Sequence, residues 1–416
     1  MEKEKLFENL SRIIDYLSKN EASIAVVGDT IIDEYYDVVA NRVSPEFPIP
    51  VMLSRDEDSK DLPGGAANVC FQFSKFDLKV DYFGFFSEYD LKQLKYYIHV
   101  VNPSNVLPFM CCVPRKKRVY QGNFPLCRWD VEKENFGMDA GELAEYRGKL
   151  KNELYAKNYS VVVYSDYNKG TFPLSESSFV KSDCITIVDP KSGPLSQWKG
   201  CTIFKPNAKE AFELTGEKDW KEQAKKIQSE LGCKAVVITR GADGVVGRID
   251  EEFFEYQPKI NSQVESVIGA GDCFVAFLAM SQLCQISILD GVKLAWHAGS
   301  LYVKRKHNEP VSALELSTHI DPIAGKIVPA SCFSYNRLWA DPITGIECPE
   351  SSRKVFDFAS VAKSVEFARA NHGGKVVVGT QTLEQATLVA CLKNVDYVVI
   401  TDSVLDSVDP DELVVW

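Results

Sequence analysis

Short apolar segments that alternate with stretches of helical length constrain the fold of this chain more than any other feature. Four segments are almost wholly apolar, at residues 23–28, 161–164, 185–188 and 235–238. Strands of this kind are buried on both faces of a parallel sheet, and the amphipathic segments 139–156, 207–216 and 219–231 could cover them as helices. The pattern predicts an α/β fold with a doubly wound, mainly parallel sheet. Ligands of such sheets bind at the carboxyl ends of the strands.

Three further segments, at 49–53, 109–113 and 118–120, look like short strands without helices between them. Strands that follow one another in this way favour antiparallel pairing. They predict a small antiparallel β lid over the main sheet, formed by about 34–56 and 109–130.

The sequence changes character near residue 325. Residues 329–353 are rich in Ser, Pro, Asp and Cys and have little periodicity, whereas 375–379 and 397–401 are again apolar strands with a helix-like segment between them. We therefore predict a large α/β domain over 1–325, a linker over 326–353 and a small C-terminal α/β unit of Rossmann-like character over 354–416.

The composition limits the partners of the chain. Its 416 residues include 47 Lys+Arg and 58 Asp+Glu, a net charge of −11, so nucleic acid and anionic membranes are not expected partners. We find no apolar span of about 18 residues and no secretory signal at the start, and the 12 cysteines and five histidines lack metal-ligand spacing. We expect a cytoplasmic protein with reduced thiols, in which local groups hold any bound phosphate.

The sharpest motif is Gly269-Ala270-Gly271-Asp272, which precedes the apolar segment 273–280. Small residues at the start of a helix let backbone N–H groups converge on an anion, and the helix dipole favours the anion there. A carboxylate beside such an anion hole could deprotonate a hydroxyl group that attacks a phosphoryl group. Taken alone, the motif also fits a Gly-rich turn in which Asp272 only stabilises the start of a helix.

Two further motifs offer groups for a polyol. Gly64-Gly65 precedes Asn68, where glycines let a ligand approach the backbone and the amide both donates and accepts hydrogen bonds. Asp29 and Asp33 follow the strand at 23–28 and could accept hydrogen bonds from sugar hydroxyls. Each motif also fits a simpler role, a tight turn for the glycines and turn or capping positions for the aspartates.

Two more motifs follow later strands. Asn207 and Glu210 could help to hold a hydrated Mg²⁺, or could form a capping box at a helix start. Thr239-Arg240-Gly241, with Gly244, could border a triphosphate or could make a hairpin turn. The P-loop, the dinucleotide Gly-x-Gly-x-x-Gly, the His-Arg-Asp loop and the serine-hydrolase and zincin motifs are absent from the sequence.

In this order, the motifs resemble those of the ribokinase-like (PfkB-type) carbohydrate kinases, over roughly residues 20–320. Gly64-Gly65-x-x-Asn68 is similar to the first signature of that family and Gly269–Asp272 to the second. The resemblance implies that Asp272 is a general base and that the amides of Gly269, Ala270, Gly271 and Asp272 form an anion hole. It implies an ATP site at Lys191, Asn207, Thr239, Arg240, Gly241 and Gly244. Mg²⁺ would be held near Asn207 and Glu210, through water.

A narrower resemblance is to the heptose-7-phosphate kinase branch, which includes the kinase half of the bifunctional heptose kinase/nucleotidyltransferase. The motifs that carry it lie at 27–33, 42–51, 64–69, 165–170 and 188–191. It implies that Asp33, Gly64, Gly65 and Asn68 bind the sugar, and that Arg118, Arg128 and Lys169 bind its phosphate. Arg118 also fits a solvated face, because residues 115–118 form a run of charges.

Some segments depart from that branch. Glu34 stands where the branch usually has arginine, and 85–90 lack its Gly-Asp motif, so the sugar pocket is expected to carry a different charge. Residues 354–358 and 394–399 resemble parts of the nucleotidyltransferase domain, but 359–363 lack its His-x-Gly-His element. We expect a degenerate, catalytically inactive remnant that has a structural role or serves as an oligomerisation surface.

The sequence thus predicts an ATP- and Mg²⁺-dependent kinase that phosphorylates a hydroxyl group of a heptose 7-phosphate or a related sugar phosphate. We expect a homodimer whose lid strands pair between the subunits. Two alternatives stay open: a kinase of the same fold that acts on another sugar or a nucleoside, and a non-catalytic scaffold that binds a nucleotide or a sugar.

Overall fold

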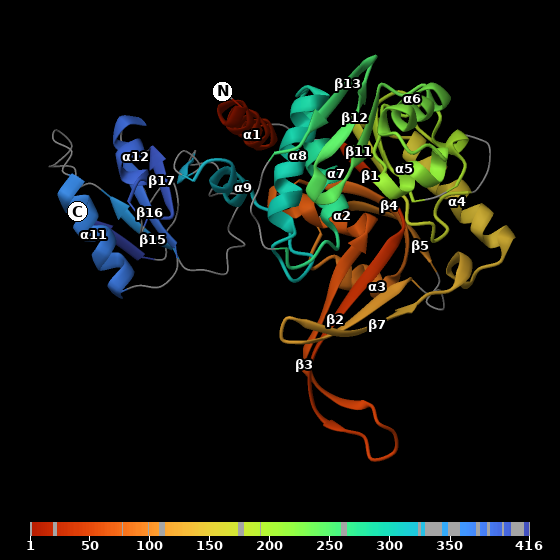
Figure 1. Cartoon of the computed structure of the whole chain (residues 1–416), viewed down its shortest axis with the longest axis horizontal. Helices are drawn as coiled ribbons and strands as arrows, with labels where there is room; N and C mark the ends of the chain where they lie inside the picture. Colours follow the sequence, from red (N-terminus) through yellow and green to blue (C-terminus); the bar gives the residue numbers. More distant parts are fainter. Residues whose placement is uncertain are drawn as a thin grey trace. The chain divides into compact units, whose positions relative to one another are not determined.

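The computed structural model of this chain contains two compact units (Figure 1). One consists of 22–74 and 78–310, and the other of 1–21, 75–77 and 311–416. The residues that the structure describes are 2–19, 23–76, 78–98, 100–107, 113–173, 179–191, 193–258, 264–322, 326–328, 343–347, 358–371, 375–380, 383–392, 395–400 and 412–415.

The first unit is built on a nine-stranded sheet with the order β13-β12-β11-β10-β9-β8-β1-β4-β5. Its strands are β1 (Ile24–Gly28), β4 (Val80–Ser87), β5 (Val100–Leu107), β8 (Val161–Ser165), β9 (Ile185–Asp189), β10 (Ile203–Phe204), β11 (Ala235–Thr239), β12 (Val245–Ile249) and β13 (Glu252–Tyr256). Every neighbouring pair from β11 to β5 is parallel. At the other edge, the pairs β11–β12 and β12–β13 are antiparallel. The predicted mainly parallel sheet is confirmed.

Helices cover this sheet on both faces, as its apolar strands require. They are α2 (Ala66–Phe73), α3 (Glu88–Leu94), α4 (Ala140–Tyr155), α5 (Ala208–Thr215), α6 (Trp220–Leu231), α7 (Ala270–Leu283) and α8 (Ile288–Tyr302). Apolar side chains of α4, α5 and α6 share one core with alternate residues of the central strands. Helices α2, α7 and α8 pack together against the sheet, and α7 is buried from Asp272 to Leu283.

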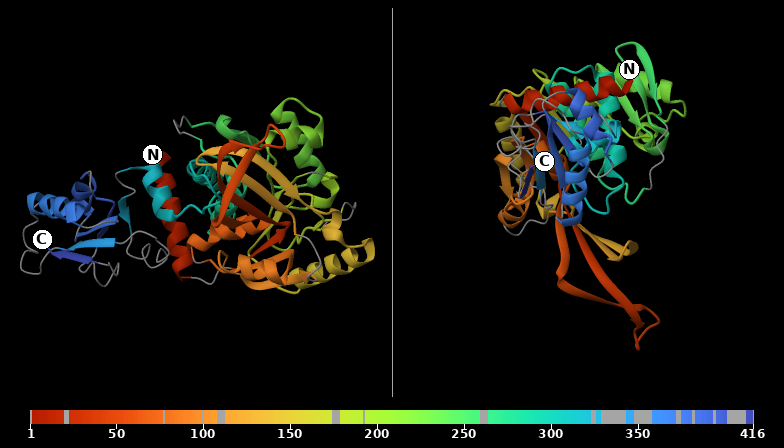
Figure 2. Two further views of the ribbon diagram at one scale, coloured as in Figure 1. Left: turned by 90° about the horizontal axis from the view of Figure 1, so that it is seen from below. Right: turned by 90° about the vertical axis from the view of Figure 1, so that its left-hand side faces the viewer.

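A second, four-stranded sheet in this unit forms the lid, with the order β3-β2-β6-β7. Its strands are β2 (Thr30–Val43), β3 (Pro50–Gly65), β6 (Arg115–Gln121) and β7 (Phe124–Val131). The long hairpin of β2 and β3 projects away from the main sheet in both figures (Figures 1 and 2). Because β2 starts directly after β1 and β3 leads directly into α2, this hairpin connects the lid to the core.

The lid differs from the sequence-based expectation in two ways. Strands β2 and β6 pair in parallel, so the predicted antiparallel flap is wrong for this pair. The hairpin reaches from Thr30 to Gly65 rather than over 34–56, because β2 and β3 stay paired down to the level where α2 begins. The predicted strand at 109–113 falls mostly outside the described residues, and β6 begins at Arg115.

The second unit contains a parallel five-stranded sheet with the order β14-β17-β16-β15-β18. Its elements are α1 (Glu2–Lys19), α9 (Ala313–Ile320), β14 (Ile327–Val328), β15 (Ile343–Glu347), α11 (Phe358–Asn371), β16 (Lys375–Thr380), α12 (Leu383–Ala390), β17 (Tyr397–Ile400) and β18 (Glu412–Val415). Valines and alanines of α11, α12, β16 and β17 form its core. The predicted C-terminal α/β fold is therefore present.

Two short strands of this sheet fall within the segment predicted as a linker, 326–353. β14 and β15 lie inside that range and pair with β17 and β16, but two and five residues are too few to give a periodic signal. Helices α1 and α9 also pack together within this unit. The predicted domain limits at 325 and 353, and the nucleotidyltransferase-like origin of the tail, stay predictions.

Among the helices of the described residues, none has the length and apolar character needed to cross a membrane.

Candidate active site

A cavity of about 570 Å³ lies at the carboxyl ends of β8 to β11, where the sequence analysis expected a ligand. It brings together most residues of the predicted nucleotide site and anion hole: Lys191, Asn207, Glu210, Thr239, Gly241, Gly244, Gly269, Ala270 and Gly271. Arg240 and Asp272 are not among the lining residues. The Arg240 guanidinium turns to the Glu255 carboxylate on β13, at 2.7 Å, and its role in ATP binding stays a prediction.

Local hydrogen bonds explain why Asn207 and Glu210 follow β10 at a spacing of three residues. Asn207 caps α5 by accepting a hydrogen bond from the Glu210 amide at 2.9 Å, and Glu210 accepts one from the Asn207 amide at 2.8 Å. The capping-box interpretation is therefore correct. The other Glu210 oxygen accepts from the Lys191 ammonium at 3.3 Å. Both residues still line the cavity, so capping places them where a nucleotide could meet them.

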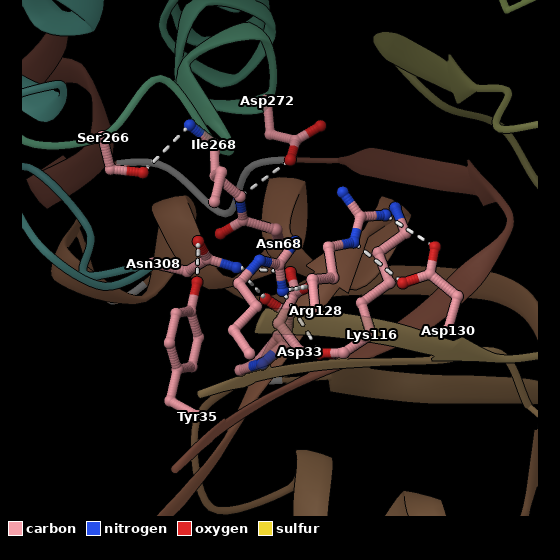
Figure 3. Close-up of polar contacts among 12 residues, drawn as sticks. Asp33, Tyr35, Asn68, Lys116, Arg128, Asp130, Ser266, Ile268, Asp272 and Asn308 are labelled. Carbon is pink, nitrogen blue, oxygen red and sulfur yellow. Dashed lines mark hydrogen bonds and ion pairs between the residues drawn. The ribbon is translucent and has the colours of Figure 1, made fainter. Parts of the chain in front are cut away.

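Asp272 lies in the first turn of α7 and is only 2% exposed. Its Oδ2 accepts a hydrogen bond from Asn68 Nδ2 at 2.8 Å, and its Oδ1 accepts one from the Tyr167 hydroxyl at 2.7 Å. Figure 3 shows the Asn68 and Asp272 side chains pointing toward one another. Burial raises the pKa of Asp272 from 3.8 to about 7, although both hydrogen bonds lower it. A carboxyl group with this pKa is suited to exchange a proton near neutral pH.

Gly269, the N-cap of α7, is needed at its position for two reasons. Its φ of 77° lies in the left-handed region, which favours glycine. A Cβ there would lie 2.5 Å from the Tyr302 hydroxyl and 2.6 Å from Asn68 Nδ2. Any side chain would therefore displace Asn68, the partner of Asp272.

Tyr167 is a residue of the site that sequence reasoning missed. Its loop follows β8, and the buried Asp29 carboxylate holds this loop by accepting hydrogen bonds from the amides of Tyr167, Lys169 and Thr171 at 2.8, 3.1 and 3.0 Å. Asp29 thus has the turn-stabilising role that the sequence left open. The loop carries the Tyr167 hydroxyl to Asp272 and places the tyrosine in the cavity wall.

The lid supplies the second half of the site, through the inner face of β6, which carries Lys116 and Arg118. Arg118 Nη1 donates to Asp33 Oδ1 at 2.6 Å. Asn308 Nδ2 donates to Asp33 Oδ2 at 2.6 Å, and Figure 3 shows these two side chains together. Arg118 is only 5% exposed, so the solvated-face interpretation is wrong. Gly64 is required beside this pair, because a Cβ there would lie 2.5 Å from Asp33 Oδ2.

Lys116 shares this inner face, because side chains two residues apart point to the same side of a strand. Its ammonium lies 5.0 Å from the ring centre of Tyr167. Burial lowers the pKa of Lys116, and the charges of Arg118 and Arg128 lower it further. Side chains along a strand point alternately to its two faces, so Lys116 and Arg118 share one face. This two-residue spacing was the signal that could have identified Lys116 from the sequence.

Glu34 lies on the opposite face of the lid, bonded to Arg115 at 2.8 Å and to Lys117 at 2.9 Å. It is neutralised there and does not face Asp33. The prediction that Glu34 changes the charge of the sugar pocket is therefore wrong, since adjacent residues of β2 point to opposite sides.

Arg128 and Lys169 each lie in an exposed ion pair. Arg128 makes two hydrogen bonds to the Asp130 carboxylate, at 2.8 and 2.6 Å (Figure 3). Lys169 lies 2.5 Å from Glu132. Exposed pairs of this kind are weak, so both cations could exchange their partner for a ligand. Their roles stay predictions.

Comparison with known proteins agrees with this geometry. Residues 158–311 match the family described as pfkB family carbohydrate kinase. The chain is 32% identical over 313 residues to the Bifunctional protein HldE of Hydrogenovibrio crunogenus, covering 73% of this chain and 63% of that protein. It is 26% identical over 310 residues to the Bifunctional protein HldE of Haemophilus influenzae, covering 72% and 64%. The chain thus spans slightly less than two thirds of these relatives.

Solved structures of similar fold match nearly three quarters of this chain. Phosphofructokinase-2 from Escherichia coli, in complex with fructose-6-phosphate, matches with a TM-score of 0.56 and 16% identity, over 72% of this chain and 98% of that one. Ribokinase from Arabidopsis thaliana, complexed with ribose and ATP, matches with a TM-score of 0.50 and 19% identity, over 73% and 99%. The fold is ribokinase-like, and the family match over residues 158–311 identifies a pfkB-type carbohydrate kinase domain in this chain.

Proposed function

We propose that this chain transfers the γ-phosphoryl group of ATP to a hydroxyl group of a sugar phosphate, heptose 7-phosphate or a close relative. The observation that carries this proposal is the position of Asp272. Its helix begins with Gly269, Ala270 and Gly271 at the wall of the 570 Å³ cavity, and its carboxylate bonds to Asn68 beside the lid. One carboxyl group thus joins a nucleotide-sized cavity to a polar sugar pocket.

In the proposed reaction, Asp272 accepts the proton of the sugar hydroxyl as its oxygen bonds to the γ-phosphorus. The bond from that phosphorus to the β–γ bridging oxygen breaks, and ADP leaves. Amides at the N-terminus of α7 would stabilise charge on the transferring group. Catalysis of this type depends mainly on positioning and electrostatics.

The cavity offers oxygen donors to a hydrated Mg²⁺, while the described residues contain no cluster of three acidic, histidine or cysteine side chains placed to ligate a metal ion directly. Carboxylates of Asp166, Asp189 and Glu210 line it together with the Asn207 amide, and Mg²⁺ prefers oxygen ligands and keeps several waters. Asn207 and Glu210 would hold the hydrated ion. When bound, Mg²⁺ supplies positive charge to the phosphate oxygens.

On the lid side, Asp33 would accept hydrogen bonds from the sugar hydroxyls, and Asn68 would both accept hydrogen bonds from them and donate hydrogen bonds to them. Arg118 is bonded to Asp33 and would orient it. Lys116, Arg128 and Lys169 are then the cations for the phosphate group already on the sugar. The likeness to proteins named Bifunctional protein HldE supports a heptose phosphate.

A binding and turnover panel tests this proposal. Calorimetry should detect Mg-ATP binding, and ADP release should require a sugar phosphate, with little release for unphosphorylated sugars or nucleosides. Release with a nucleoside would instead favour the second kinase hypothesis. An absence of Mg-ATP binding would favour a non-catalytic sugar-binding scaffold.

Tyr167→Phe should move the acid limb of the pH dependence of kcat/KM to higher pH. The tyrosine hydroxyl lowers the pKa of Asp272 by donating a hydrogen bond, so its removal leaves the base protonated over a wider range. We expect up to about tenfold slower turnover below pH 7, the effect of one pKa unit. The matched control is Tyr155→Phe. The Tyr155 hydroxyl donates a hydrogen bond to the Val180 carbonyl, and Tyr155 does not line the cavity. An unchanged acid limb in Tyr167→Phe would contradict the assigned contact.

We further propose that two copies pair through their lids, in the cytoplasm. Several large apolar side chains of the lid are exposed: Val39, Val43, Phe47, Ile49, Leu53, Phe124 and Trp129. Exposed apolar side chains that gather on one element are typical of an association surface. Sedimentation velocity should show a dimer, whereas a monomer at micromolar concentration would contradict this assembly.

A further inference from the structure

Lys205 is a buried cation in the wall of the nucleotide-sized cavity. It directly follows β10, where its amide donates to the Val188 carbonyl at 2.8 Å, and it is only 2% exposed. Its ammonium lies 2.9 Å from Asp189 Oδ1 at the end of β9, and both residues line the cavity.

The ion pair lies next to the start of α7. A Cβ built on Gly271 would lie 3.8 Å from Lys205 Nζ and 3.8 Å from Asp189 Oδ2. Because Gly271 is in the first turn of α7, the ammonium lies beside the backbone that forms the predicted anion hole. An anion held there would meet a helix N-terminus and a buried cation together.

The surroundings of Lys205 keep it charged. Burial alone would lower the pKa of Lys205, but the negative charges of Asp189, Glu210 and Asp272 outweigh this effect. The pKa of Lys205 is therefore raised above its ordinary value. An ammonium has three N–H donors, and Asp189 occupies one of them. The remaining donors can serve a ligand in the cavity.

We propose that Lys205 contacts the γ-phosphoryl group of the nucleotide and stabilises its charge during transfer, while Asp189 positions the ammonium. This inference rests on the proposed kinase function. The bonds formed and broken, and the proton moved to Asp272, stay those of the proposed reaction. Lys205 adds a fixed positive charge and takes no proton.

A buried lysine elsewhere in the same unit provides a control. Lys181 is 3% exposed and lies 3.1 Å from Asp183, but it does not line this cavity. Lys181→Met thus has the general cost of losing a buried, paired lysine. Lys205→Met has that cost together with the loss of the proposed phosphate contact.

The test compares the affinities of each variant for ADP and for a non-hydrolysable ATP analogue, both with Mg²⁺, by calorimetry. Lys205→Met should bind the analogue at least about tenfold more weakly, the effect of one charge-assisted hydrogen bond, while ADP affinity stays within about twofold. Turnover should fall about 10²–10³-fold, as for a lost oxyanion donor. Lys181→Met should keep the preference of the wild type for the analogue.

Removing one partner of a buried ion pair can prevent folding. If Lys205→Met does not fold, Asp189→Asn/Lys205→Met leaves no unpaired charge, and it should show the same selective loss. An unchanged ratio of analogue to ADP affinity in either Lys205 variant would overturn this inference but leave the kinase proposal intact. A wild-type chain that binds neither nucleotide would overturn both.

Discussion

Asp272→Asn should lower kcat by about 10²–10⁴, the range for loss of a general base. The amide can still accept the hydrogen bond of Asn68 Nδ2, so the local geometry is kept, but it cannot accept a proton from the sugar hydroxyl. The measurement is ADP release at saturating ATP and sugar phosphate, above pH 7. Near-normal turnover would remove Asp272 from the mechanism.

The raised pKa of Asp272 gives this variant a second, opposite effect. Because burial raises the folded pKa from 3.8 to about 7, the carboxyl group favours folding while protonated, and this contribution is lost as the pH rises through about 7. Asp272→Asn should therefore increase the free energy of unfolding above pH 7, as urea denaturation would show. Wild-type kcat/KM should also decrease as the pH falls below about 7.

Asp81→Asn is a matched control for both effects. Asp81 is also a buried aspartate that accepts two side-chain hydrogen bonds, from Tyr159 at 2.6 Å and from Lys157 at 2.8 Å. It is not among the residues that line the cavity. Its variant should turn over at close to the wild-type rate, and a loss as large as that of Asp272→Asn would point to a general effect of buried aspartates.

Arg118→Met should reduce both stability and sugar affinity. The change leaves the Asp33 carboxylate buried with Asn308 as its remaining partner, and breaking a buried ion pair in this way costs about 3–5 kcal/mol. Asp33 would also lose its orientation toward the sugar, so KM for the sugar phosphate should rise at least about tenfold. Urea denaturation and steady-state kinetics measure the two effects.

Two further variants separate the causes. Asp33→Asn/Arg118→Met removes both charges, so it should recover much of the lost stability while KM stays high. Lys117→Met changes a cation on the other face of the same strand, where Glu34 keeps its bond to Arg115. It should leave KM within about threefold of the wild type. Equal KM effects of Lys117→Met and Arg118→Met would contradict the assignment of two faces.

The main sheet and the nucleotide side of the site could be predicted from the sequence, because local patterns determine them. Strands that are buried on both faces consist almost wholly of apolar residues. The residues that follow β10 and β11, and those that precede α7, have strong turn and capping preferences. Asn207 and Glu210 form the predicted capping box and also line the cavity, so their capping role does not exclude the proposed ligand role.

The partners of the site residues could not be predicted, because they depend on contacts between distant segments. Tyr167 reaches Asp272 only because Asp29, far earlier in the chain, holds its loop. The Asp33–Arg118 pair depends on the parallel register of β2 and β6, which two separated strands do not reveal in their sequences. The short strand β14 gave no periodic signal at all.

Phosphoryl transfer to a sugar phosphate is tested most directly by a ³¹P NMR time course of the protein with Mg-ATP and heptose 7-phosphate. We expect the γ-phosphate signal to decrease while ADP and a second phosphate ester on the sugar appear in equal amounts, and we expect Asp272→Asn to slow all three changes together. Folded wild-type protein that binds Mg-ATP, yet forms no new phosphate ester with this or any other sugar phosphate, would overturn the proposed kinase activity.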